Sequence, residues 1–364
     1  MFPADGKRPL VTPRPLRLVL LTPLGRGAVA TLRVEGPGAV AVVAEHFVTR
    51  NSLSVDRLVF GRFGAEPAEE VVVRRESDAA VEIHCHGGLA AVRRLQQILV
   101  ESGCRLVSWQ DWAARHEPDP IAAAARIALA EATTPRTAAI LLDQYRGSLA
   151  RALQEIDASL ESGDSIAARQ QIDALLARGP LGLHLVRPWQ VVVAGRPNVG
   201  KSSLINAIVG FGRVIVHPTP GTTRDIVAVQ TVLDGWPVEL SDTAGLHDTG
   251  DAIERAGIEL AKRKLAAADL ILLVFDRTAA WSPSDRALLE SQPGALAVHN
   301  KIDLAPEAGT RPPGHAVSAL REEGIEELCR AIVGRLIPRP PSPGAAVPFT
   351  PEQLQQIHGY LRRV

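Results

Sequence analysis

Lysine is scarce in this sequence: of the 40 basic residues only five are lysine, at positions 7, 201, 262, 264 and 301. Acidic residues also number 40, so the formal net charge is zero, and charge alone predicts neither nucleic-acid nor membrane binding. The three cysteines, Cys85, Cys104 and Cys329, are far apart and include no Cys-x-x-Cys pair. This spacing argues against a disulfide framework or a zinc site and favours a reducing compartment.

Long apolar runs are lacking as well. The longest one near the N-terminus, Leu16–Leu21, is too short for a signal peptide or a membrane span, so we expect a cytoplasmic protein without membrane association. We find no internal repeats. The 364 residues, 46% of them hydrophobic, suffice for two or three globular domains.

The N-terminal half of the chain divides into two segments of different composition. Residues 1–116 mix short β-rich runs with Gly and Pro, which predicts a small α+β domain. Residues 117–187 are rich in Ala and Leu and predict a helical domain. In that segment we expect one helical face to carry Tyr145, Leu149, Leu153, Ile156 and Leu160, and we expect the helix pattern to break at Gly179–Gly182.

The C-terminal half alternates short apolar runs with helical patterns across residues 188–338. The runs are Val191–Ala194, Val238–Leu240, Leu270–Phe275 and Ala295–Val298. Such alternation predicts an α/β domain whose mostly parallel sheet is flanked by helices. Residues 339–364 read as a Pro-rich linker followed by a short helix.

A phosphate-binding loop follows the first of these runs. Residues 195–202, GRPNVGKS, fit G-x-x-x-x-G-K-[ST] between an apolar strand and an amphipathic helix. Glycine lets the backbone curl so that successive N–H groups point at one oxyanion, while Lys201 adds charge and the Ser202 hydroxyl ligates Mg²⁺.

A second motif selects the base. The run Asn300-Lys301-Ile302-Asp303 follows the last buried strand, where a carboxylate can accept both guanine N1–H and N2–H. Adenine offers no matching pair of donors, so an unpaired carboxylate disfavours it. Ser318 and Ala319 lie where a further loop can brace the guanine through its backbone.

Between these motifs lie two candidate switch segments. Asp242-Thr243-Ala244-Gly245 follows the Val238–Leu240 strand; Asp242 can hold the hydration shell of Mg²⁺, and the Gly245 N–H can meet the γ-phosphate. Upstream, the loop at 220–225 offers one of its two threonines to the same Mg²⁺, and the pattern of related GTPases favours Thr223. Leu246 stands where many GTPases carry a glutamine that orients the attacking water, so the water must be placed otherwise.

Together these segments resemble the TrmE–Era–EngA branch of GTPases, through GRPNVGKSSL at 195–204, GTTRD at 221–225 and DTAGL at 242–246. Two N-terminal segments, TPLGRGAVATLR at 22–33 and VEIHCHGG at 81–88, narrow the resemblance to the MnmE (TrmE) family of tRNA-modification GTPases. The predicted nucleotide-binding residues are Gly195, Asn198, Gly200, Lys201, Ser202, Ser203, Thr223, Asp242, Gly245, Asn300, Lys301, Asp303, Ser318 and Ala319.

The resemblance implies a mechanism that does not need the missing glutamine. In that family the G domains dimerise across the nucleotide face, and a K⁺ ion supplies the charge that an arginine finger supplies elsewhere. Asn198 matches the asparagine that helps hold the K⁺, and Glu254 matches the acidic residue that positions water. Read without the family, Asn198 could be an ordinary turn residue and Glu254 a carboxylate at a helix N-terminus.

The resemblance also implies partners. The chain would form a constitutive homodimer and would bind a flavoprotein of the MnmG (GidA) type and tRNA. The N-terminal domain would bind a folate one-carbon donor. Arg26 and Arg33 lie in the part of that domain that matches, where a scaffold role competes with folate contact. Cys85 and His86 could form a reactive pair, but the sequence favours a buried pair at a strand end.

The sequence departs from the family pattern at two places. It has no Cys-x-Gly-Lys motif after Cys329, and the segment Trp109–Leu129 lacks the family's Asn-Gly-Lys-x-Asp-Leu run. Two further functions therefore stay open beside tRNA modification: a regulatory or ribosome-assembly GTPase switch that has lost the modification chemistry, and a scaffold that no longer hydrolyses GTP.

Overall fold

The computed structural model describes residues 15–23, 25, 27–117, 119–212, 228–242, 263–304 and 310–364. The chain divides into two compact units, residues 1–123 and 124–364. Within the described residues, every helix is too short or too polar to cross a bilayer. The predicted boundaries at 116/117, 187/188 and 338/339 stay predictions, and the structure adds that the helical segment and the α/β segment belong to one unit.

The N-terminal unit is built on one seven-stranded sheet in the order β3-β4-β5-β6-β2-β1-β7. The elements are β1 (Arg17–Leu20), β2 (Val29–Glu35), α1 (Ala39–His46), β3 (Phe47–Val48), β4 (Leu58–Phe63), β5 (Glu69–Ser77), β6 (Ala80–His86), α2 (Leu89–Glu101), β7 (Arg105–Val107) and α3 (Trp109–His116). Gly61 and Arg62 interrupt the apolar pattern of β4, so this strand is not evident from the sequence.

Alternation along the central strands gives this sheet two different faces. Leu32 and Val34 of β2 are buried in a core that also contains Val43 of α1 and Leu95 of α2. The intervening positions of β2, including Arg33, lie on the opposite, more polar face. The α+β character predicted for this region is therefore confirmed.

In the C-terminal unit a set of helices precedes the second sheet: α4 (Pro120–Glu131, shared with the first unit), α5 (Pro135–Tyr145), α6 (Ser148–Glu161) and α7 (Ser165–Leu183). The prediction of one helical face from Tyr145 to Leu160 is wrong at its start. Tyr145 ends α5, and Gly147 has φ of 91°, a left-handed conformation that ends one helix and begins the next. Leu149, Leu153 and Ile156 are buried on α6 as expected.

The predicted break at Gly179–Gly182 is also wrong, because α7 runs through Pro180 to Leu183. The glycines serve close packing instead: a side-chain carbon at Gly182 would overlap the carbonyl of Pro348, and one at Gly179 would overlap Leu354. Residues 344–360 thus return onto the helices, ending in α12 (Pro351–Tyr360), which packs against α7.

A buried amide holds this returning segment. Gln144 is fully buried; its Nε2 donates to the carbonyl of Ala345 at 3.0 Å, and its Oε1 accepts from the N–H of Val347 at 3.0 Å. Both polar ends of the side chain are satisfied by backbone, as burial requires.

The α/β part contains a six-stranded sheet in the order β13-β12-β11-β8-β10-β9. Its elements are β8 (Trp189–Ala194), α8 (Lys201–Phe211), β9 (Ala228–Leu233), β10 (Trp236–Asp242), β11 (Leu270–Asp276), α10 (Pro283–Glu290), β12 (Leu296–Asn300), β13 (His315–Ala316) and α11 (Ile325–Leu336). Only β9 runs antiparallel to its neighbour. The predicted α/β fold with a mostly parallel sheet is confirmed.

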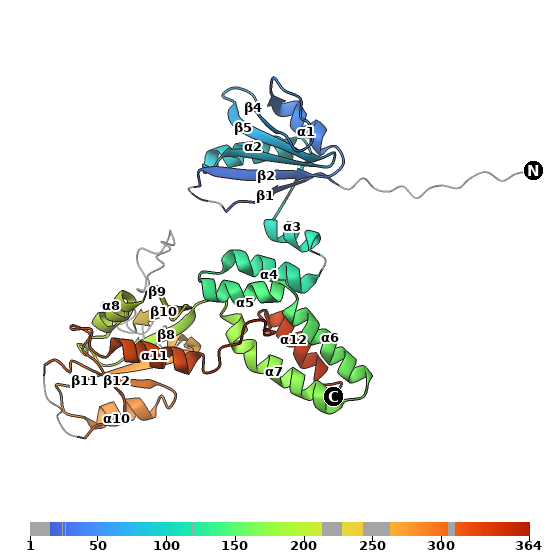
Figure 1. Ribbon diagram of the computed structural model, residues 1–364. Helices are drawn as coiled ribbons and strands as arrows, with labels where there is room; N and C mark the ends of the chain where they lie inside the picture. The colour runs from blue at the N-terminus through green and yellow to red at the C-terminus, as the bar shows by residue number, and fades with distance from the viewer. Residues whose placement is uncertain are drawn as a thin grey trace, which may run out of the picture. The chain divides into compact units, whose positions relative to one another are not determined.

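Helices cover both faces of this sheet (Figure 1). Helices α8 and α11 pack together against one face of the sheet. Helix α10 lies near Leu273 and Phe275 of β11, whose side chains alternate in direction with those of Leu272 and Val274.

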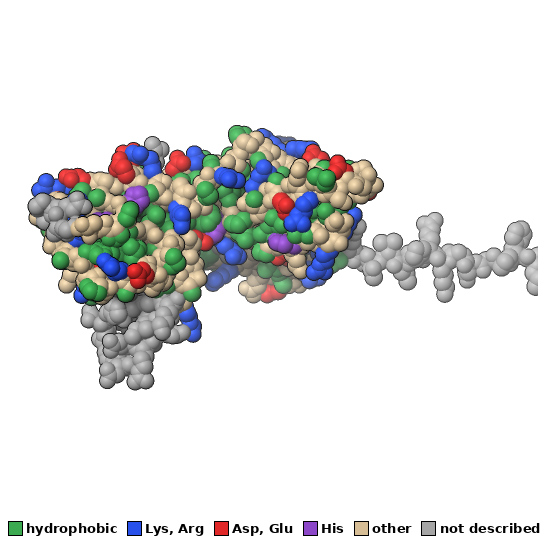
Figure 2. Space-filling model, turned by 90° about the horizontal axis from the view of Figure 1, so that it is seen from below, with side chains coloured by type: hydrophobic (Ala, Val, Ile, Leu, Met, Phe, Trp, Pro, Cys, Tyr) green, Lys and Arg blue, Asp and Glu red, His purple; other side chains and the backbone are tan. Residues whose placement is uncertain are grey.

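Basic and acidic side chains are interspersed on the face of the molecule that Figure 2 shows, in agreement with the zero net charge.

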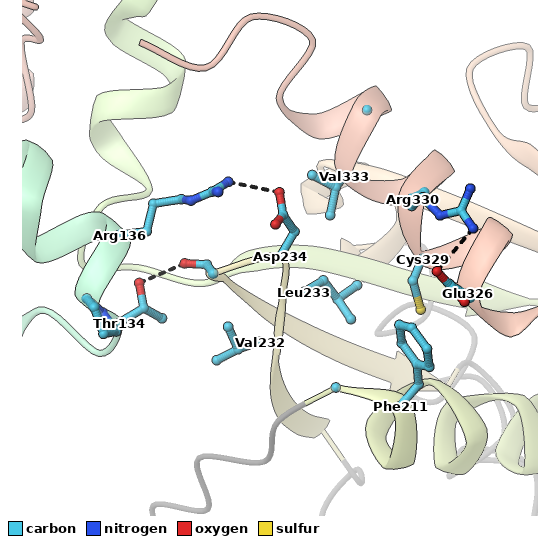
Figure 3. A pocket seen from close by; sticks show the side chains of 14 residues that line it. Thr134, Arg136, Phe211, Val232, Leu233, Asp234, Glu326, Cys329, Arg330 and Val333 are labelled. Carbon is cyan, nitrogen blue, oxygen red and sulfur yellow. Dashed lines mark hydrogen bonds and ion pairs between the residues drawn. The ribbon is translucent and has the colours of Figure 1, made fainter. Parts of the chain in front are cut away.

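The helices and the sheet of this unit meet at the β9–β10 hairpin (Figure 3). The Thr134 hydroxyl donates to the carbonyl of Gly235 at 2.8 Å, and Arg136 pairs with Asp234 at 2.9 Å. A cavity of about 980 Å³ opens beside them, lined by apolar side chains such as Phe211 and Leu233. The phosphate-binding loop does not line this cavity, so cavity size does not locate the chemistry here.

Candidate functional site

The predicted site residues that the structure describes gather at the carboxyl edge of the second sheet. The phosphate-binding loop leaves β8 at Ala194, Asp242 ends β10, and Asn300 ends β12. Parallel strands deliver their carboxyl ends to the same edge, where open α/β sheets bind ligands. Thr223, Gly245 and Glu254, together with Leu246, lie outside the described residues.

Gly200 shapes the loop. Its φ is 94°, and a side-chain carbon on it would overlap Nδ2 of Asn300. The next residue, Lys201, begins α8, and Gly200 has no side chain to cap the first-turn N–H groups. These N–H groups and the positive end of the helix dipole form an anion site at this end of the helix.

Lys201 lies inside the loop, 5% exposed. Its Nζ donates to the carbonyls of Gly195 at 3.2 Å and Arg196 at 3.1 Å. Among the described residues no carboxylate forms an ion pair with Lys201, so its charge is balanced only by carbonyl dipoles. A phosphate oxygen offers that ammonium a stronger partner.

Two oxygen donors meet next to the loop. The Ser202 hydroxyl donates to Oδ2 of Asp242 at 2.9 Å, which joins the start of α8 to the end of β10. Ser203, beside Ser202, is exposed at the same helix end. A hydroxyl and a carboxylate in contact are hard ligands of the kind that Mg²⁺ prefers.

Asn300 ties the base-recognition motif to the phosphate-binding loop. It is 2% exposed; its Nδ2 donates to the carbonyl of Val199 at 2.9 Å, and its Oδ1 accepts from the N–H of Ala319 at 3.0 Å. One buried amide therefore joins the predicted phosphate-binding loop to the loop that is predicted to brace the base.

Asp303 and Ser318 are the remaining residues of the predicted base pocket. The Ser318 hydroxyl, fully buried, donates to Oδ1 of Asp303 at 2.6 Å. No described cation pairs with Asp303, so the carboxylate keeps acceptor capacity for the two N–H groups of a guanine edge. The structure thus brings Asn300, Lys301, Asp303, Ser318 and Ala319 together as predicted.

Asp276 is the residue that the sequence reasoning missed. It ends β11 in register with Asn300, and its Oδ2 lies 2.6 Å from Nζ of Lys301. Burial opposes its ionisation, but hydrogen bonds from Lys301 and Thr278 outweigh burial and lower the pKa of Asp276. The available signal was an aspartate directly after the Leu270–Phe275 run.

The remaining candidates in the N-terminal unit divide differently from expectation. Cys85 is buried, and this burial, together with a smaller effect of the nearby Glu69, raises the pKa of its thiol to about 11. His86, in contrast, is exposed and hydrogen-bonded to Glu69 at 2.6 Å. The reading of Cys85 and His86 as a buried pair is therefore wrong for His86, since the strand end turns it outward. Arg26 lies outside the described residues, and Arg33 pairs with Glu35, Glu76 and Glu82.

Comparison with known proteins agrees with this geometry. Residues 190–301 match the family described as 50S ribosome-binding GTPase, and residues 18–115 match the family described as GTP-binding protein TrmE N-terminus. Fold and site together define a P-loop GTPase, an enzyme that binds and hydrolyses GTP.

Longer matches identify the family. The chain is 33% identical over 370 residues to the tRNA modification GTPase MnmE of Moorella thermoacetica, covering 86% of this chain and 80% of that one. It is 30% identical over 369 residues to the protein of the same name from Bacillus subtilis, with 85% and 80% covered. The chain belongs to the MnmE family.

Solved structures match part of the chain. A crystal structure of Aquifex aeolicus Era bound to GDP and AlF4⁻ is 28% identical with a TM-score of 0.33, covering 42% of this chain and 57% of that one. The G domain of the Thermotoga maritima FeoB iron transporter is 28% identical with a TM-score of 0.30, covering 41% and 99%.

Proposed function

We propose that GTP hydrolysis by this protein drives the modification of wobble uridine in tRNA. The observation that carries the proposal is the presence, in one chain, of a TrmE-type N-terminal segment and a nucleotide site whose described residues are in place. Relatives that align over most of their own length are named tRNA modification GTPases. A fold alone would not justify the assignment, whereas this combination supports it.

Mg²⁺ would accompany the nucleotide. Ser202 and Asp242 fit it, because their oxygen atoms already lie 2.9 Å apart at the edge where the β- and γ-phosphates would lie. Thr223 is the third protein ligand of the proposal. Bound Mg²⁺ would neutralise charge that develops on the phosphate oxygens, while Lys201 and the first-turn N–H groups of α8 orient them.

K⁺ would stimulate hydrolysis by way of Asn198. The Asn198 side chain is exposed and forms no hydrogen bond with any described residue, so its amide oxygen is available to a cation. Its backbone has φ of 64°, and its carbonyl accepts from Lys301 at 2.8 Å, which holds the main chain that carries this side chain. Glu254 would position the attacking water in place of the glutamine that Leu246 replaces.

The partners of this proposal are a second copy of the chain, a flavoprotein of the MnmG (GidA) type, and tRNA. Three large apolar side chains support a self-contact of the N-terminal unit: Val48 of β3 and Leu58 and Phe60 of β4 are 70%, 63% and 61% exposed. Apolar exposure at a sheet edge favours pairing with another surface. A folate one-carbon donor belongs to the same proposal, although Arg33 is already balanced by carboxylates.

The decisive experiment combines two measurements on the full-length chain. GTP turnover is compared in KCl and NaCl, and tRNA nucleosides are profiled in a strain that lacks the gene, with wild type and Lys201→Ala as the complementing variants. We expect turnover to be faster in KCl, and modified wobble uridine to return only with wild type. Faster turnover in KCl with unchanged uridines would instead favour a regulatory or ribosome-assembly switch, and undetectable turnover in both salts would favour a scaffold.

Glu254→Ala separates hydrolysis from binding. We expect unchanged GTP affinity and hydrolysis slowed by about 10²-fold or more, since the variant loses only the group that orients water. Loss of GTP binding in this variant would show that the role of Glu254 is misassigned.

A further inference from the structure

Lys301 is held at both ends in an unusual way. Its backbone has φ of 71°, in the left-handed region that a residue with a side chain rarely adopts. At the other end, Nζ donates to the carbonyl of Asn198 at 2.8 Å and to Oδ2 of Asp276 at 2.6 Å. The four-carbon stem is therefore stretched between the base-recognition motif on one side and two acceptors from other segments on the other.

Asp276 is itself fixed in orientation. Its Oδ1 accepts from the N–H of Thr278 at 2.8 Å and from the Thr278 hydroxyl at 2.7 Å, which leaves Oδ2 to face Lys301. The end of strand β11 is anchored to β12 as well, because the N–H of Arg277 donates to the carbonyl of Asn300 at 2.9 Å. A carboxylate so constrained can hold a lysine ammonium at one point.

We propose that Asp276 is a positioning residue for nucleotide binding: it holds the stem of Lys301 as a flat platform for the purine ring and, through Lys301, ties this platform to the phosphate-binding loop at Asn198. Asp303 reads the edge of the base, whereas Lys301, two residues earlier, offers an apolar stem that has no preference among purines. Asp276 thus determines how long a purine nucleotide stays bound, and Asp303 determines which one.

A purely structural ion pair is the competing explanation. The side chains of Lys301 and Asp276 are 28% and 20% exposed, so the pair lies at the rim of the site and not in the core. An ion pair at such a partly exposed position contributes little to folding. An effect on nucleotide release, measured on sites that are already folded and occupied, distinguishes the two roles because a smaller folded fraction does not change a dissociation rate.

The test is release of fluorescently labelled GDP and IDP from the full-length protein. For Asp276→Asn we expect dissociation to be roughly tenfold faster, by the same factor for both nucleotides, because a charge-assisted contact is lost while the base edge is still read by Asp303. Thr278→Val, which removes one hydrogen bond from the carboxylate, is expected to accelerate release about threefold. Asp234→Asn is the matched control: it removes a carboxylate from an ion pair at the β9–β10 hairpin and leaves the rate unchanged.

A double-mutant cycle completes the test. In a Lys301→Met background, where there is no ammonium to hold, Asp276→Asn should change release by less than about twofold. Unchanged release in the Asp276→Asn single variant, or a full effect in the Lys301→Met background, would overturn the proposal. A change in the GDP-to-IDP ratio in Asp276→Asn would do so as well, since it would assign Asp276 to edge recognition.

Discussion

Lys201 and Arg33 are cations in two units of the same protein, and their surroundings are opposite. Lys201, 5% exposed, donates to two backbone carbonyls and has no carboxylate partner among the described residues. Arg33, whose side chain is 13% exposed, is surrounded by Glu35, Glu76 and Glu82. The charge of Arg33 is compensated inside the fold, whereas the charge of Lys201 is left for a ligand to compensate.

The difference teaches how to distinguish a ligand-binding cation from one that stabilises the fold when both are largely shielded from solvent. A cation with several carboxylate neighbours contributes to folding, and removing it leaves like charges together. A cation held only by carbonyl dipoles contributes little to folding and much to the binding of an anion. Four predictions follow from this contrast.

The largest effect is expected for Lys201→Ala. GTP affinity should fall by at least about a thousandfold, because the phosphates lose their nearest positive charge. The unfolding free energy of the nucleotide-free protein should change by less than about 1 kcal/mol, since no buried charge is left unpaired. Calorimetric titration with GTP and chemical denaturation measure the two quantities, and a large loss of stability would contradict the contrast.

Arg33→Met should show the reverse. We expect the N-terminal unit to lose about 2–3 kcal/mol of stability, since three carboxylates are left without their shared cation. GTP affinity should stay as in wild type, because the nucleotide site belongs to the other unit. Hydrogen exchange of β2 and β6 reports the loss locally; unchanged protection there would show that the cluster is not a scaffold.

Asp303→Asn tests a second charged group that, like Lys201, has no ion-pair partner among the described residues. The amide would oppose the N–H groups of guanine with a donor of its own, so GTP affinity should fall by about a hundredfold. A purine with a carbonyl at C2 would satisfy that donor, so xanthosine triphosphate should bind better than to wild type. Competition between the two nucleotides measures this shift, and retained selectivity for GTP would count against base recognition by Asp303.

The smallest effect concerns pH. Burial is the largest single influence on Glu35 and opposes its ionisation, but the contributions of Arg33, Trp112 and His116 together outweigh burial and lower the pKa of Glu35. A lowered pKa stabilises the fold above the unfolded-state pKa, and this stabilisation is lost as the pH falls through the folded-state pKa. In Arg33→Met the hydrogen bond from Trp112 and the charge of His116 remain, but the contribution of Arg33 is lost, so the pKa of Glu35 is less lowered than in wild type and less stability is lost as the pH falls.

The cost of Arg33→Met should therefore be smaller at pH 4 than at pH 7, by about 1 kcal/mol. Urea denaturation at the two pH values, with hydrogen exchange of β2 as the probe of unfolding, measures the difference. Equal costs at both pH values would show that Glu35 does not contribute through Arg33.

Much of the nucleotide site could be predicted from sequence because its signals are local. Gly200, Lys201 and Ser202 are consecutive, and the bend that places them is encoded by the glycine between a strand and a helix. Asn300 and Asp303 likewise share one short motif after one strand. The apolar runs at Val191–Ala194 and Leu270–Phe275 predicted β8 and β11 because buried parallel strands are hydrophobic on both faces.

The rest could not be predicted, because local patterns misled or were silent. The four-residue spacing of Tyr145 and Leu149 continues across Gly147, where the backbone turns and the helix changes. The Gly179–Gly182 run looked like a break, yet α7 continues, and the glycines admit the returning chain, which lies more than a hundred residues away in sequence.

The sequence by itself determined that this protein is a P-loop GTPase of the MnmE family, since consecutive residues form the phosphate loop, the guanine motif and the N-terminal segments at 22–33 and 81–88. Only the tertiary structure decided which charges serve the fold and which serve the ligand. Arg33 meets Glu82, and Asp276 meets Lys301, across 49 and 25 residues of chain. Because compensation depends on distances between segments that only folding brings together, no spacing in the sequence distinguishes the charge of Lys201 from that of Arg33.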